Sequence, residues 1–123
     1  MYEGAVELLF RARDLVRLGW AQGADSRAAD GAAVDPWEAV AASWSLLGAL
    51  VAALEERADE GHDLPLEELA LALGALEPFV DDDSLARWND EPSRTQDAVA
   101  DVLTAAANAA GERLRAPPTQ SPN

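Results

Sequence analysis

The segment from Trp88 to Thr95 contains the residue types best suited to chemistry in this chain. Asn89, Asp90 and Arg94 could converge on a ligand, with Trp88 as an apolar wall and Asp90 as a general base. A structural interpretation competes with this one: Trp88 fills the core, Asn89 and Asp90 form a turn, and Arg94 pairs with Asp90. We favour the structural interpretation, because Asn and Asp shortly before a proline usually form turns.

Tryptophan is the second unusual feature, with four in 123 residues. Trp37 and Trp44 are seven residues apart, which would place them on one face of a helix. Tryptophans usually anchor a core, but they also line ligand pockets and partner grooves. The candidate ligand or partner site therefore comprises Trp20, Trp44, Trp88, Asn89, Asp90 and Arg94.

Sites for metals, cofactors and covalent catalysis are not expected. His62 is the only histidine, and Asp59 is the one acid at helical spacing before it, whereas a metal site needs three or four ligands. Residues 81–83 are three aspartates, but they lack the glycine and late glutamate of a calcium loop. The chain has no cysteine, no Gly-x-Ser-x-Gly or Ser-x-x-Lys motif and no phosphate-binding glycine loop.

The net charge of the chain indicates which kinds of macromolecule it could bind. Asp and Glu number 23 against 9 basic residues, all arginine, and the net charge is −14. Such a surface disfavours nucleic acid and anionic membranes, but it leaves a basic protein open. The first ten residues do not resemble a signal peptide, and the nearly uncharged stretch 39–54 is short for a membrane span, so we expect a cytoplasmic protein.

Helical periodicity and helix-capping patterns define the elements that position these residues. We predict an all-α, four-helix bundle-like domain over 1–115, without strands, followed by a disordered Pro-rich tail over 116–123. Asp35 to Glu38 and Ser93 to Gln96 are expected to form capping boxes, with Asp35 and Ser93 as N-caps. The expected helices are 3–18, 36–59, 65–77 and 94–114, with a helical turn at 85–88 and a loop at 21–34.

Three segments taken together resemble an uncharacterised domain family of actinobacteria and their phages. They are Gly19-Trp20-Ala21-Gln22-Gly23, Leu47-Gly48-Ala49-Leu50 and Trp88-Asn89-Asp90-Glu91-Pro92-Ser93-Arg94-Thr95. They match the family's "GW-Q-G", "GAL" and "WND-P-RT" motifs in order, over roughly residues 8–107. Many relatives have a cysteine before the Gly-Ala-Leu triplet, where this chain has Trp44-Ser45-Leu46. The resemblance implies domain boundaries but no activity.

Two hypotheses for function remain at this point. The first is a non-catalytic accessory or protein–protein interaction domain, because no catalytic motif is present. The second is a small cofactor-free acid–base enzyme or small-ligand binder that uses a Trp-lined pocket near Asn89, Asp90 and Arg94. Mimicry of nucleic acid by the acidic surface ranks last. The expected partner is a second copy of the chain, docked through residues 36–59 or 94–114, or another protein.

Overall fold

The described part of the chain folds into five α-helices, one 3₁₀ turn and one small two-stranded sheet. The computed structural model describes residues 2–61 and 66–115. The elements are α1 (Tyr2–Leu18), β1 (Ser26–Ala28), β2 (Ala41–Trp44), α2 (Leu46–Asp59), α3 (Leu66–Leu76), η1 (Glu77–Phe79), α4 (Leu85–Asn89) and α5 (Gln96–Arg115). The protein is thus mostly helical, but it is not the pure all-α bundle that the sequence predicts.

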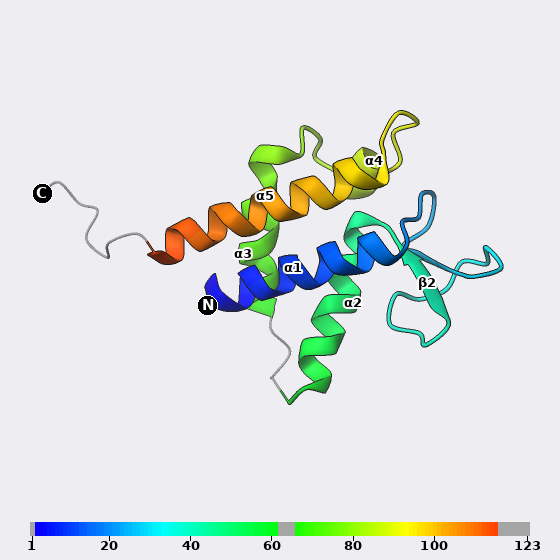
Figure 1. Ribbon diagram of the computed structural model, residues 1–123, viewed down its shortest axis with the longest axis horizontal. Helices are drawn as coiled ribbons and strands as arrows, with labels where there is room; N and C mark the ends of the chain where they lie inside the picture. Colours follow the sequence, from blue (N-terminus) through cyan, green and yellow to red (C-terminus); the bar gives the residue numbers. More distant parts are fainter. Residues whose placement is uncertain (1, 62–65, 116–123) are drawn as a thin grey trace, which may run out of the picture.

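Helix α1 is the centre of the domain. It packs against α5, α2 and α3, and Figure 1 shows α1 and α5 side by side with α2 and α3 running across them. Small and branched apolar residues fill the core, so the helices approach closely. Fully buried side chains include Leu8, Leu9, Ala12 and Val16 of α1, Ala49, Leu50 and Ala53 of α2, and Val99, Leu103 and Ala106 of α5.

The largest departure from expectation lies between residues 21 and 45. The predicted loop contains β1, and the first ten residues of the predicted helix 36–59 form a turn and β2. The two strands pair antiparallel, with Ser26 opposite Trp44. Trp44 also exchanges backbone hydrogen bonds with Gly19 (3.0 Å) and Ala21 (3.1 Å). These long-range bonds to Trp44 overcome the helical periodicity of the segment, as tertiary pairing commonly does.

The capping box predicted at Asp35 forms only in part. The Asp35 N–H donates to Glu38 Oε2 at 2.8 Å, and the Glu38 N–H donates to the Asp35 carbonyl at 3.0 Å. The segment forms only a turn, and α2 begins at Leu46, ten residues after the predicted start at Pro36. Its N-cap is Ser45, whose Oγ accepts from the Gly48 N–H at 3.0 Å. The prediction that Asp35 caps the central helix was therefore wrong.

The remaining helices lie where the sequence predicts them, within two residues at each end. Ser93 does not cap α5, however, because the cap is Thr95, whose Oγ1 accepts from the Ala98 N–H at 3.1 Å. Gln96 donates instead to the carbonyl of Val16 at 2.7 Å, near the C-terminal end of α1. The predicted tail, 116–123, and His62 lie outside the described residues. In the part of the chain that the structure describes, no helix is long and apolar enough to cross a membrane.

Candidate functional site

Asn89, the last residue of α4, is the centre of a buried hydrogen-bond network. Its side chain is fully buried. Oδ1 accepts from Trp20 Nε1 (2.8 Å) and from the Leu46 N–H (3.0 Å). Nδ2 donates to the Ala21 carbonyl (2.9 Å) and to Asp90 Oδ1 (3.1 Å). A side-chain amide has two donors and two principal acceptor positions, so all four are occupied.

Two neighbours of Asn89 extend this network to the loop after α1. Asp90 accepts from the Gly23 N–H at 3.0 Å through the same oxygen that faces Asn89. Gln22 donates to the carbonyls of Asn89 (3.0 Å) and Glu91 (2.9 Å). The segment Gly19–Gly23 and the segment Trp88–Thr95, almost seventy residues apart, are therefore bonded directly to each other.

Arg94, just before α5, extends the hydrogen-bond network to Trp88. Its Nε donates to the Trp88 carbonyl at 2.9 Å, and its guanidinium lies 3.8 Å from the centre of the Trp88 ring. This is a cation–π contact on a buried tryptophan. The proposed pairing of Arg94 with Asp90 was wrong, because Arg94 bonds Trp88 and the Asp90 oxygen faces Gly23 and Asn89.

Two glycines let the backbones approach this closely. A Cβ on Gly48 would lie 1.9 Å from the Asp25 carbonyl oxygen, and a Cβ on Gly19 would lie 2.3 Å from the Ala42 carbonyl oxygen. Both distances are far below van der Waals contact, so any side chain would push the segments apart. These contacts explain physically why glycine stands at positions 19 and 48.

The six candidate residues do converge, as the hypothesis of a shared site requires. Trp44 and Trp88 are buried, Trp20 is half-buried, and Trp20 and Trp44 are bridged by backbone pairing. The surface hollow next to them measures about 150 Å³, and Asp90 is the one candidate residue that lines it. Small-molecule pockets usually span about 300–1,000 Å³. The network thus has a clear structural role, and ligand binding by these residues stays a prediction.

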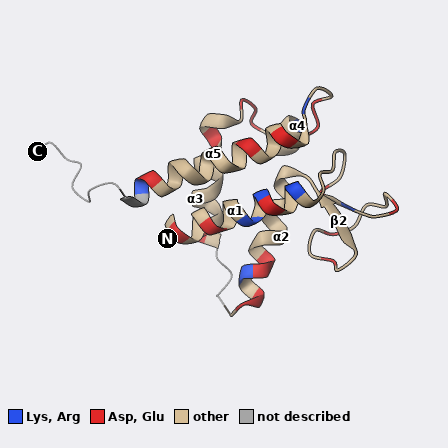
Figure 2. Cartoon of the chain, viewed as in Figure 1, with Lys and Arg blue, Asp and Glu red and all other residues tan. Residues whose placement is uncertain are grey.

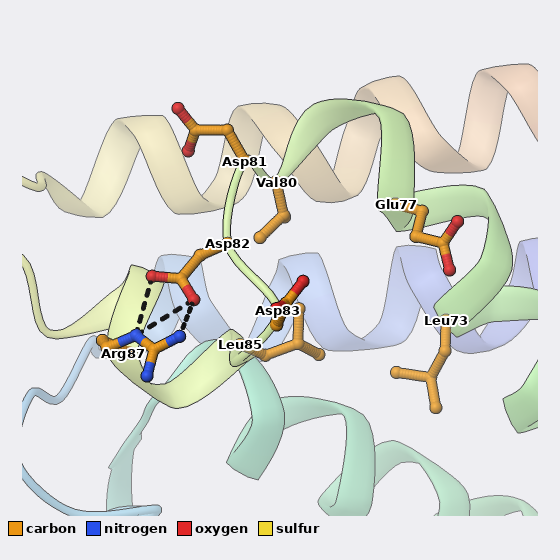
Figure 3. A pocket seen from close by; sticks show the side chains of 8 residues that line it. All are labelled: Leu73, Glu77, Val80, Asp81, Asp82, Asp83, Leu85 and Arg87. Carbon is orange, nitrogen blue, oxygen red and sulfur yellow. Dashed lines mark hydrogen bonds and ion pairs between the residues drawn. The ribbon is translucent and has the colours of Figure 1, made fainter.

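The aspartates at 81–83 line a second, more open hollow of about 880 Å³ beside Leu73, Val80 and Leu85 (Figure 3). Asp82 forms a bidentate ion pair with Arg87, and it also accepts a hydrogen bond from the Ser84 N–H at 2.9 Å. The Arg87 bond, followed by the Ser84 bond, lowers the pKa of Asp82 to about 2. Among the described residues, no group of three His, Cys, Asp or Glu side chains is arranged to hold a metal ion.

The exposure of some surface residues was predicted wrongly from the sequence or was not predicted. Trp37 was expected on a buried helical face, but it lies in the turn before β2 and is 57% exposed. Val40 in the same segment and Leu18 at the end of α1 are also exposed. No local signal separates this turn from a helix, because the spacing of its apolar residues is helical.

A family model described as "Family of unknown function (DUF6197)" matches residues 1–109, and the chain belongs to this family. No curated protein and no solved structure matches the chain.

Proposed function

We propose that this member of the DUF6197 family is a non-catalytic interaction domain that binds a basic protein through an exposed apolar surface around Trp37. The observation that carries the proposal is the exposure of three large apolar side chains, one at the end of α1 and two in the turn before β2. Leu18 is 77% exposed, Trp37 57% and Val40 61%. They define the Trp37 surface. Trp is the residue type most enriched among the energetic centres of protein interfaces.

β2 brings together the backbone segments that carry Leu18 and Val40. Leu18 precedes Gly19, which packs against the backbone of Ala42, and Val40 directly precedes β2. The end of α1 therefore lies beside the strand that directly follows the Trp37 turn, although the sequence separates Leu18 from Trp37 by almost twenty residues.

The turn that carries Trp37 is held by hydrogen bonds at both ends. Its first residues are joined by the two Asp35–Glu38 bonds, and the Ala41 N–H donates to the Glu38 carbonyl at 3.0 Å. Trp44 Nε1 donates to the carbonyl of buried Pro36 at 3.1 Å. A side chain presented by such a turn loses little conformational entropy on binding.

The charge beside the Trp37 surface indicates the chemistry of the partner. A hollow of about 480 Å³ lies next to the turn, and three carboxylates line it: Asp25, Asp35 and Glu38. Figure 2 shows further acidic residues on α1, α2, α3 and α5 and in the loops. A protein with an apolar groove and Arg or Lys at its rim fits both features, and the opposite charges would speed association.

A second copy of the chain is the alternative partner for the Trp37 surface. The surfaces first considered for a homodimer, on 36–59 and 94–114, are largely used inside the domain, since α2 and α5 contribute many buried residues. Two copies meeting at the Trp37 surface would also bring their acidic hollows together. Such a dimer would tighten with salt, whereas binding of a basic partner would weaken.

The test uses the whole chain as bait in an extract of the cells that make it, in parallel with Trp37→Ala and Leu66→Ala. Leu66 is 58% exposed on α3, outside the Trp37 surface, and is the matched control. Any protein retained by wild type and control but not by Trp37→Ala is purified, and its Kd is measured over a salt series. We expect Trp37→Ala to weaken binding by about tenfold or more, and salt to weaken it further.

Two outcomes would overturn the proposal. One is the absence of any protein whose retention depends on Trp37. The other is Trp37-dependent dimerisation of the chain itself that strengthens with salt, which would establish the self-association alternative. Circular dichroism of both variants confirms that the fold is intact.

A further inference from the structure

An apolar pocket of about 300 Å³ opens where α3 meets α1 and α5, away from the Trp37 surface. Its walls come from all three helices and η1, and most of them are small or apolar, among them Ala70, Leu71, Gly74 and Ala110. Tyr2 and Arg113 supply the polar groups. The volume lies at the lower end of the usual range for small-molecule sites, which are mostly apolar with a few polar groups.

Gly74 shows that space is left open here. A Cβ on Gly74 would meet no atom within 4 Å, whereas one on Gly4 or Gly48 would collide with Glu68 or Asp25. Glycine inside a helix is less favourable than alanine. Close packing explains this at Gly48, but at Gly74 the missing side chain only keeps the pocket open.

The pocket has one cation. Arg113 donates to the Tyr2 hydroxyl at 3.4 Å, across the gap between α5 and α1. No carboxylate among the described residues forms an ion pair with Arg113, in contrast to Arg11 and Arg57. In a chain of net charge −14, the guanidinium at this pocket is thus available for an anion.

We propose that this pocket binds a small amphipathic carboxylate. The carboxylate accepts hydrogen bonds from Arg113 and the Tyr2 hydroxyl, and the apolar chain lies over Gly74 between α3 and α5. Arginine recognises carboxylates through paired N–H donors, and the neighbouring hydroxyl supplies a third. This inference does not depend on the Trp37 surface, and either proposal can fail alone.

Isothermal titration calorimetry with decanoate, decanol and decyltrimethylammonium as probes tests the proposal on the whole chain. We expect saturable one-to-one binding of decanoate and weaker binding of the other two. Arg113→Gln should weaken decanoate binding by about tenfold or more, because a charge-assisted hydrogen bond is lost. Gly74→Leu should abolish it by filling the pocket. Arg17→Gln, on the exposed end of α1, is the matched control and should leave it unchanged.

A second probe, an N-acetylated dileucine with a free carboxylate, separates the two sources of such a group. Tighter binding of decanoate indicates a fatty acid, and tighter binding of the peptide indicates a protein C-terminus. Gly74→Leu replaces a helical glycine where a Cβ meets no atom within 4 Å, so its fold is expected to survive, and circular dichroism checks this. The proposal is overturned if decanoate does not saturate, if decanol binds equally well, or if Gly74→Leu or Arg113→Gln binds decanoate like wild type.

Discussion

At the scale of single residues, Asn89 is the side chain on which we expect the stability of the fold to depend most. Its four hydrogen bonds join the loop after α1, the start of α2 and the end of α4. Aspartate could not replace it, because a carboxylate accepts but does not donate, and the Ala21 carbonyl would lose its donor. The amide therefore connects the segment Gly19–Gly23, the start of α2 and the segment Trp88–Thr95.

Asn89→Ala should destabilise the domain strongly. It leaves the Trp20 indole N–H, the Leu46 N–H and the Ala21 carbonyl without their partner, and each such buried group costs about 1–3 kcal/mol. We expect the free energy of unfolding in urea to fall by about 3 kcal/mol or more. Asn108→Ala, on the exposed side of α5, is the control and should change it by no more than about 0.5 kcal/mol. Equal effects of the two variants would contradict the role assigned to Asn89.

Asp82 should make stability depend on pH at the acidic end. Its pKa falls to about 2 from an ordinary 3.8, first because of Arg87 and then because of the Ser84 N–H. A lowered pKa in the folded state favours the carboxylate, so the stabilisation is present above about pH 4 and is lost as the pH falls toward 2. NMR titration should show the pKa of Asp82 moving back toward 3.8 in Arg87→Gln. An unchanged pKa in that variant would show that the ion pair does not form in solution.

At the scale of elements, the start of α2 is decided by competition between two N-caps. The stronger local pattern for the start of a helix is the capping box Asp35-Pro36-Trp37-Glu38, compared with Ser45. Only a turn forms at that capping box, however. Ser45 caps the helix because β2 places Trp44 in backbone pairing with Gly19 and Ala21. A helix over 36–44 would break those bonds and also the pairing with β1.

Ser45→Ala and Asp35→Ala distinguish the two starts. Loss of the Ser45 hydroxyl leaves the Gly48 N–H unpaired, and we expect the free energy of unfolding to fall by about 0.5–2 kcal/mol. Asp35→Ala should change it by no more than about 0.5 kcal/mol, because the turn bonds of Asp35 use its backbone. Urea denaturation measures both. The reverse order would mean that the helix begins at Pro36 after all.

At the scale of the whole molecule, an ion-pair network joins three helices that the sequence separates. Arg57 of α2 is only 5% exposed and bonds Glu7 of α1 (2.6 Å) and Glu68 of α3 (3.0 Å). Arg11 of α1 extends the network to Glu7, Glu56 and Glu60. Glu68 reaches this network because residue 4 is glycine, since a Cβ on Gly4 would overlap the Glu68 carboxylate.

Arg57→Met should weaken the contacts among α1, α2 and α3. The methionine keeps most of the apolar stem, so the change mainly removes the charge. Breaking a fully buried pair costs about 3–5 kcal/mol, but Glu7 and Glu68 are partly exposed and can rehydrate, so we expect a loss of about 2 kcal/mol. Thermal or urea melts measure this loss. Arg17→Met, on the exposed end of α1, should stay within about 0.5 kcal/mol, and a comparable loss there would contradict the assignment.

The sequence by itself determined α1, α3, α4 and α5, whose apolar residues repeat with the helical period and whose ends lie within two residues of the predicted ones. It also brought Trp20, Asn89 and Asp90 together as one candidate site, because tryptophan, asparagine and aspartate are residue types that can bind a ligand. It could not determine that β2 replaces the first part of a helix, since hydrogen bonds from Trp44 to Gly19 and Ala21 are tertiary. For the same reason the exposure of Trp37 and the pocket beside Gly74 and Arg113 could not be read from local patterns. Both depend on which segments pack against each other, and long-range pairing and close backbone contact decide that.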